Sequence, residues 1–221
     1  MKVKSPFISD DPAQDVTRRH LLEAAGEVFA EEGFRAATVR EICQRAGANV
    51  AAINYHFGDK ETLYVEVLRY AHGRALGKYP LLLGLPETAP PREKLHAFVL
   101  SLLSRIFEKG PNSWHGRLMS REMIEPTPAL DSLIEERIRP MSNVLWKIIS
   151  EILNCPPTDQ RVLSCAFSVL SQCVFYKHCR PAVVKLFPGL LPEDPEAVAM
   201  LADHITRFSL AAMKDYSAKK N

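Results

Sequence analysis

The chain has 221 residues and a formal net charge of +2, and its length allows one large domain or a small domain joined to a larger one. Hydrophobic residues make up 47% and charged residues 24%, a composition that is typical of a folded soluble protein and excludes a disordered chain. Residues 1–15 lack the apolar core of a signal peptide, and the longest uncharged stretch, 162–176, is too short to span a bilayer, so we expect a cytoplasmic protein that binds no membrane.

The N-terminal part predicts a loose arm followed by a long helix. Asp11 and Pro12 form a typical pair of N-cap and first helical residue, so the helix is expected to begin near them. Gly33 provides a stop, so the helix is expected to end near Glu32. Apolar residues with helical spacing give it a buried face: Leu22, Ala25 and Phe29.

Two short helices and a longer one are predicted next, each with its own capping signal. Thr38 and Glu41 have the form of a capping box, and Gly47 ends the helix that they open. Asn49 is a good N-cap for the second short helix, and Asp59 caps the longer one. The three helices are expected over 38–46, over 49–57 and from about 60 past 70.

The rest of the chain predicts a second, larger helical region. The segment from Tyr79 to Pro91 is rich in proline, leucine and glycine, which indicates a connection between the two regions. No strand-like alternation stands out, and Pro140 is expected to kink or split one long helix. The helices are expected near 92–107, 114–125, 129–153, 158–178 and 195–216. The predicted fold class is therefore all-α.

The two short helices, joined by a glycine turn, have the geometry of a helix-turn-helix unit, whose second helix enters the major groove of DNA. Residues 1–75 carry slightly more acidic than basic side chains, but basic ones predominate from 35 to 60, so a local basic face is possible. Capped helix pairs also occur in ordinary helical bundles, so the spacing alone leaves DNA binding open.

The second short helix is expected to turn small or polar side chains towards the groove, while Val50 and Ile53 face the core. Polar side chains around it suit phosphates, which fix affinity and register. The candidates next to bases are Ala48, Asn49, Ala51 and Asn54, and those next to phosphates are Thr38, Arg40, Tyr55, His56 and Lys60.

Three runs between residues 17 and 69 form a distinctive pattern: Thr38–Cys43, Ala46–Asn49, and Ile53–Tyr64 with its aromatic-His-Phe turn followed by a lysine. With these runs, the segment resembles the DNA-binding domain of the TetR family. The resemblance implies base contacts by the second short helix and phosphate contacts by Thr38, Tyr55 and Lys60.

This sequence departs from the family pattern at two positions of the second short helix. Asn49 replaces the usual Ser or Thr cap, which is a physically equivalent choice. Asn54 stands where many members have an aromatic residue, so the operator sequence does not transfer.

The later part of the chain resembles the C-terminal domain of the CecR/CerR-type subgroup, on the segment 117–140 and the run Gln172–Tyr176. The subgroup resemblance implies a ligand-responsive bacterial repressor of efflux or membrane-transport genes. The domains then expected are a flexible arm over 1–15, a three-helix DNA-binding domain over 16–78, and a helical ligand-binding and dimerisation domain over 79–221. The expected partners are double-stranded operator DNA, a small-molecule effector and a second copy of the chain.

An apolar pocket with a few polar groups is the usual form of an effector site, although aromatic residues at helical spacing are more often ordinary core. Arg121 would favour an anionic or carbonyl-bearing compound, but pairing with Glu122 or Glu125 is the simpler interpretation. The candidates are Phe98, Leu102, Trp114, Arg121, Trp146, Gln172 and Tyr176.

Neither a cofactor nor a metal site is predicted. The five cysteines include no C-x-x-C pair, and Cys173, His178 and Cys179 lack metal-ligand spacing, so we expect reduced and mostly buried thiols.

The last two long helices are expected to hold a two-fold dimer. The last helix has apolar residues at steps of three and four, and the helix before it is apolar on nearly every face, so a four-helix bundle would cover both. The expected interface residues are Phe167, Leu170, Val174, Val198, Leu201, Ile205, Phe208 and Ala212.

Two other classes of function compete with a repressor. An all-helical enzyme would need a titratable pair in a pocket, and the sequence offers no nucleophile and base, glycine-rich phosphate loop or H-E-x-x-H motif. A dimerisation protein that has lost DNA binding would not be expected to keep Tyr55 and Lys60. We therefore expect a regulator and no enzyme.

Overall fold

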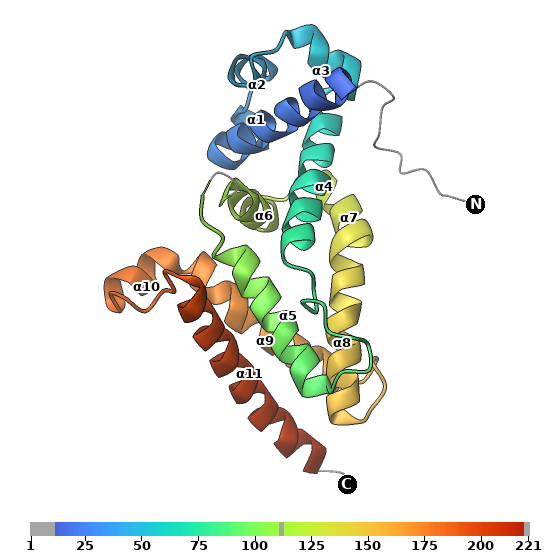
Figure 1. Ribbon diagram of the computed structural model, residues 1–221, viewed down its shortest axis with the longest axis vertical. Helices are drawn as coiled ribbons and strands as arrows, with labels where there is room; N and C mark the ends of the chain where they lie inside the picture. The colour runs from blue at the N-terminus through green and yellow to red at the C-terminus, as the bar shows by residue number, and fades with distance from the viewer. Residues whose placement is uncertain (1–11, 111–112, 219–221) are drawn as a thin grey trace, which may run out of the picture. The chain divides into compact units, whose positions relative to one another are not determined.

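The computed structural model describes residues 12–110 and 113–218, and every regular element within them is a helix, so the protein is all-α as predicted (Figure 1). The helices divide into two compact units. Of the described residues, the first unit contains those from Pro12 to Gly73 together with Arg117–Leu133, and the second contains those from Arg74 to Gly116 and from Ile134 to Ala218. This division differs from the predicted one in two ways: the first stretch ends at Gly73 and not at residue 78, and a segment from the middle of the chain groups with the N-terminal helices.

The first unit begins with α1 (Pro12–Ala36), which opens on the predicted proline, whereas Asp11 lies outside the described residues. Residues 12–15 thus belong to the helix and not to an arm. Gly33 interrupts the helix with φ 85° and ψ 166°, a backbone conformation that glycine adopts without strain. One further turn follows it, so the element ends four residues later than Glu32.

Three helices complete the N-terminal part of this unit: α2 (Val39–Ala46), α3 (Val50–Phe57) and α4 (Lys60–Lys78). The Asp59 carboxylate accepts a hydrogen bond of 2.7 Å from the backbone N–H of Thr62, which confirms the predicted cap of α4. The small core of the unit includes the fully buried side chains Phe29, Ile42, Ile53, Leu63 and Val67. Each contributes about 1.5–3 kcal/mol by leaving water.

In the second unit, α5 (Pro91–Ile106), α8 (Arg139–Leu153), α9 (Gln160–His178) and α11 (Pro195–Ala218) pack around one apolar core (Figure 1). Its fully buried residues include Leu95, Leu103, Leu145, Ile149 and Val169. A short helix between α9 and α11, α10 (Arg180–Leu186), was not predicted. It spans only two turns, which is too short for a periodic pattern, although Pro181 in its first turn is typical of a helix start.

The long helix predicted over 129–153 is split, as the proline suggested. It consists of α7 (Ala129–Leu133), a π-helical segment η2 (Ile134–Ile138) and α8, which has Pro140 in its first turn. The helix before it is α6 (Trp114–Ile124). None of the helices within residues 12–110 and 113–218 is long and apolar enough to cross a membrane.

Candidate functional site

The turn between α2 and α3 is built by the predicted caps. The Thr38 hydroxyl accepts a hydrogen bond of 3.2 Å from the backbone N–H of Glu41 at the start of α2. Gly47 ends α2 in the left-handed region at φ 64°, and the N–H of Ala48 reaches back to the carbonyl of Cys43 at 2.9 Å. Asn49 then caps α3 by accepting from the N–H of Ala51 at 3.0 Å. Side-chain and backbone groups thus fix the angle at which α3 leaves α2.

The outer face of α3 is small and polar, apart from one apolar side chain. Ala51 and Asn54 are exposed, and Ile53 is fully buried beneath them. Val50, in contrast, is 43% exposed, so the prediction that it faces the core is wrong. Val50 is the first residue of α3. Side chains of a helix lean over the preceding turn, and because Val50 has no preceding turn, its side chain remains exposed. Ala48 lies half-buried in the turn.

Two of the predicted phosphate-binding residues are exposed at the surface of the first unit. Tyr55 is 70% exposed, with its ring edge-on to His56 at 4.9 Å between centroids. Arg40 is exposed on α2, and within the described residues no carboxylate lies at ion-pair distance from its guanidinium. Tyr55 and Arg40 therefore both present exposed polar groups of the kind that contact phosphates.

His56 and Lys60 are less available than the sequence suggested. Burial, and then the charge of Arg18, lower the pKa of His56, so its imidazole is uncharged at neutral pH. Lys60 is half-buried and donates from Nζ to the carbonyl oxygen of Ala37 at 2.7 Å. The same ammonium lies 4.8 Å from the centroid of the Phe34 ring. Lys60 therefore ties α4 to the loop before α2.

Two arginines that sequence reasoning did not single out position the helices of this unit. Arg18 pairs with Glu66 at 2.7 Å and lies over the ring of Phe57, the last residue of α3, at 5.3 Å from its centroid. Arg45 forms ion pairs with three acidic residues, at distances between 2.8 and 3.8 Å: Glu27, Glu31 and Glu41. The guanidinium of Arg45 is thus neutralised by ion pairs within the unit. Arg40 is therefore the better candidate on α2 for a phosphate contact.

The segment Arg117–Leu133 is attached to the first unit through a buried carboxylate. Glu122 is 0% exposed and accepts hydrogen bonds from the Tyr64 hydroxyl at 2.6 Å and from the Thr127 hydroxyl and N–H at 3.0 and 2.9 Å. Burial, and then the bond to Glu122, raise the pKa of Tyr64 well above its usual range, so the phenol stays protonated and donates.

Arg121, a predicted effector ligand, also belongs to this segment. Its guanidinium donates to the carbonyl of Glu31 at 3.2 Å and lies 3.5 Å from the Glu125 carboxylate. Pairing with Glu125 was one of the two simpler interpretations of this arginine. A Cβ atom at Gly33 would lie 2.7 Å from Arg121 Nε, so a side chain there would push the guanidinium away, and the φ of 85° independently favours glycine. Arg121 lies in the first unit, whereas the other six candidates lie in the second.

Four of those six pack in or against the core of their unit: Phe98 is buried in it, and Leu102, Trp146 and Tyr176 are partly buried against it. Trp114 is also buried. Gln172 and Tyr176 line a cavity of about 360 Å³ between α9 and α11, where Gln172 donates to the Ser209 hydroxyl at 3.2 Å.

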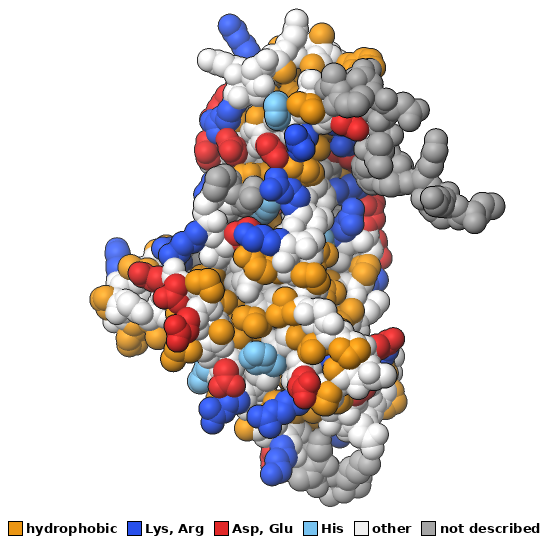
Figure 2. All heavy atoms as spheres, in the orientation of Figure 1, with side chains coloured by type: hydrophobic (Ala, Val, Ile, Leu, Met, Phe, Trp, Pro, Cys, Tyr) orange, Lys and Arg blue, Asp and Glu red, His pale blue; other side chains and the backbone are white. Residues whose placement is uncertain are grey.

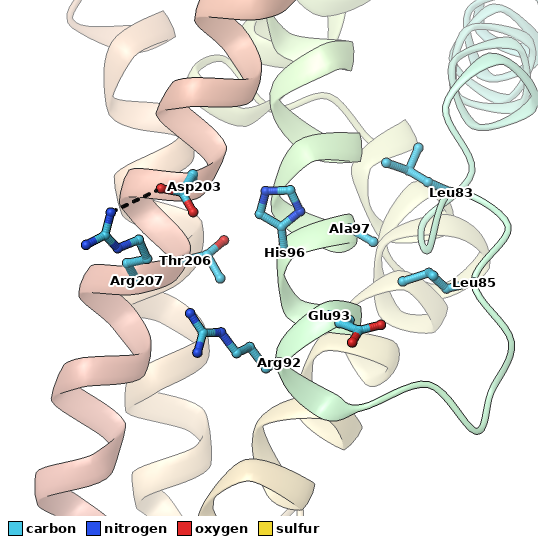
Figure 3. A pocket seen from close by; sticks show the side chains of 9 residues that line it. All are labelled: Leu83, Leu85, Arg92, Glu93, His96, Ala97, Asp203, Thr206 and Arg207. Carbon is cyan, nitrogen blue, oxygen red and sulfur yellow. Dashed lines mark ion pairs between the residues drawn. The ribbon is translucent and has the colours of Figure 1, made fainter.

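Another cavity of the second unit, about 520 Å³, lies between α5, α11 and the loop at Leu83 and Leu85 (Figure 3). Arg92 and His96 come from α5, and Arg207 of α11 lies 3.5 Å from Asp203 on its own helix. None of the seven predicted effector ligands lines this cavity.

The predicted dimer residues fall into three groups. Phe167, Phe208 and Ala212 are exposed, with Phe167 63% and Phe208 60% accessible. Leu170, Val174 and Leu201 are half-buried. Val198 and Ile205 are buried inside their own subunit, because the apolar stripe of α11 divides between the core and the surface. Val198 and Ile205 are therefore not part of the interface that we propose.

Exposed apolar side chains that the prediction missed adjoin this surface. They are Phe175 on α9 and Met200 on α11, together with four residues of α10 and the loop after it: Val184, Leu186, Phe187 and Leu190. Figure 2 shows hydrophobic side chains at the surface around α10. We call Phe167, Phe175, Met200 and Phe208 the α9–α11 face.

Comparison with known proteins places the chain in a family. Residues 21–67 match the family model for bacterial regulatory proteins of the tetR family, and residues 91–213 match the C-terminal domain of the HTH-type transcriptional dual regulator CecR. The CecR regulator of Shigella flexneri is 24% identical over 86% of this chain and 87% of its own length. The repressor KstR2 of Mycolicibacterium smegmatis is 35% identical, over 44% of this chain and 47% of its own length.

A solved structure shares the fold at low sequence identity. The crystal structure of AibR in complex with isovaleryl coenzyme A and operator DNA superposes with a TM-score of 0.63 at 17% identity, over 87% of this chain and 97% of that one. Because the two family models together span both helical regions, the chain belongs to the TetR family of bacterial regulatory proteins and carries a C-terminal domain of the CecR type.

Proposed function

We propose that this protein represses transcription by binding a palindromic operator as a homodimer, and that a small molecule in the second unit releases it. The observation that carries the proposal is the capped turn between α2 and α3, which holds the exposed residues Ala51 and Asn54 on one short helix. Small side chains there allow the helix to approach base edges closely. Arg40 and Tyr55 flank it with groups that suit phosphates.

Two similarities support the ligand-responsive part of the proposal. The AibR structure contains both an acyl coenzyme A and operator DNA, and the C-terminal domain matches that of a transcriptional dual regulator. The subgroup resemblance further suggests efflux or transport genes as targets. In this scheme the effector prefers the released conformation, because only a difference in affinity between two states moves an equilibrium.

The test is selection of bound DNA by the purified full-length chain from a library of random duplexes. We expect an inverted repeat to be enriched, and its affinity to fall linearly with the logarithm of salt concentration. Mapping the binding sites on genomic DNA would then identify the regulated genes. Enrichment of no sequence, or of a single half-site without its repeat, would contradict the proposal.

A further inference from the structure

The second unit holds a guanidinium group that no carboxylate of the described residues neutralises. Arg105 lies in the last turn of α5 and donates from Nε to the carbonyl of Ser101 on its own helix at 3.2 Å. Its Nη1 atom lies 3.2 Å from the sulfur of Met141 on α8, which is a weak acceptor. Its Nη2 atom is buried and has no hydrogen-bond partner.

The neighbours of this group supply no compensating charge. Cys173 on α9 is fully buried, and burial raises the pKa of its thiol to about 12 although Arg105 opposes that rise. Burial in turn lowers the pKa of Arg105 to about 10. At neutral pH the thiol is therefore uncharged and the guanidinium is still protonated, so a positive charge lies between α5, α8 and α9 on a half-buried side chain whose Nη2 atom is buried.

Another cation of α5, in contrast to Arg105, has an acidic partner. Lys94, one of the buried residues of α5, forms an ion pair with Glu151 of α8. A buried charge without such a partner is costly, and an apolar side chain of similar volume would pack there at lower cost. A structural role in joining α5 to α8 therefore does not explain why residue 105 is an arginine.

We propose that Arg105 is the counter-charge for the effector, and that the effector is an organic carboxylate on an apolar body. This inference rests on the proposed function, because it takes the second unit as the place where the effector binds. The N–H groups left at Nη1 and Nη2 form a planar fork that matches the two oxygens of a carboxylate. The buried surroundings accept a hydrocarbon body better than a strongly hydrated inorganic anion. The role that the sequence suggested for Arg121 thus passes to Arg105.

The test compares carboxylates with their neutral amides on the full-length protein. Octanoate, dodecanoate and benzoate are titrated by calorimetry and by thermal denaturation, beside octanamide, dodecanamide and benzamide. We expect at least one carboxylate to bind about tenfold or more tightly than its amide. Arg105→Met is expected to lose this preference, and Arg105→Lys to retain part of it, since lysine keeps the charge without the planar fork.

A ligand-binding role and a structural role for Arg105 predict opposite effects of its removal on thermal stability. If the arginine is kept for its ligand, Arg105→Met without ligand melts at or above the temperature of the unchanged protein, because a buried charge has been removed. Arg180→Met, at an exposed arginine of the same unit that lines neither described cavity, is the matched control and leaves both readouts unchanged. A lower melting temperature for Arg105→Met together with unchanged binding overturns the inference.

The operator assay separates this inference from the proposed function. If the unchanged protein binds its operator but prefers none of the carboxylates to its amide, the inference fails and the proposed function stands. If carboxylates bind through Arg105 but no operator is found, the repressor proposal fails.

Discussion

Lys60 and Arg40 are both cations beside α3, but they differ in what they already contact. Lys60 donates to the carbonyl of Ala37, whereas Arg40 has no ion pair within the described residues. We expect Lys60→Ala to lower the stability of the protein by about 1 kcal/mol, the usual net contribution of such a hydrogen bond. Arg40→Ala should leave the stability unchanged and reduce the slope of log affinity against log salt by about one. Denaturation and salt titrations of both variants check this, and a flattened slope for Lys60→Ala at unchanged stability would reverse the assignment.

A second effect at the residue scale concerns the buried carboxylate of Glu122. Tyr64→Phe removes the hydroxyl that donates to it and leaves a fully buried acceptor with fewer partners, so we expect a loss of about 1–3 kcal/mol. Tyr70→Phe is the matched control, because the Tyr70 hydroxyl donates to Glu23, which is only half-buried and regains water. Urea denaturation of the two variants measures the difference. Equal losses would show that burial of Glu122 does not decide the effect.

At the scale of an element, α3 is expected to choose the operator sequence without setting the general affinity for DNA. Asn54→Gln and Ala51→Ser change groups on its exposed face and leave the Asn49 cap in place. We therefore expect a changed base preference, worth about 1–3 kcal/mol at the affected position, and an unchanged salt slope. Val50→Ala adds a test of apolar contact with thymine methyl groups, since this side chain is 43% exposed. Selected DNA libraries compared between variants supply the readout, and identical preferences would exclude α3 as the reading helix.

The elements also explain why some features were predictable from the sequence and others were not. The caps at Thr38, Asn49 and Asp59 depend on residues two or three positions apart, so a local pattern identifies them. The contact between Glu122 and Tyr64 joins positions 58 apart, and the pattern around Glu122 contains no sign of its partner. The charge at Arg105 was missed for the same reason: its distinguishing feature is the lack of a nearby acid in space.

At the scale of the whole molecule, we expect a second copy of the chain to cover the α9–α11 face. It exposes large apolar side chains, and a soluble protein gains by burying such a patch. The two helices that carry it contact each other within the subunit, so their pairing across a two-fold axis gives a four-helix bundle. Phe208, 60% exposed, and Phe167, 63% exposed, mark the centre of the contact that we expect.

Phe208→Asp is expected to turn the dimer into a monomer, because a carboxylate would lose its water in an apolar interface. Two half-sites must be read together at about one helical turn of DNA, roughly 34 Å, so a monomer holds only one of them. We expect the operator affinity to fall by about 100-fold or more, as joined binding sites become independent. Ile124→Asp, at an exposed apolar residue of the first unit, is the control for adding a charge, and it should remain dimeric. Analytical ultracentrifugation and operator titration measure the two effects. A Phe208→Asp protein that remains dimeric would exclude this face from the interface, and a monomeric one with full affinity would show that the operator is read by single subunits.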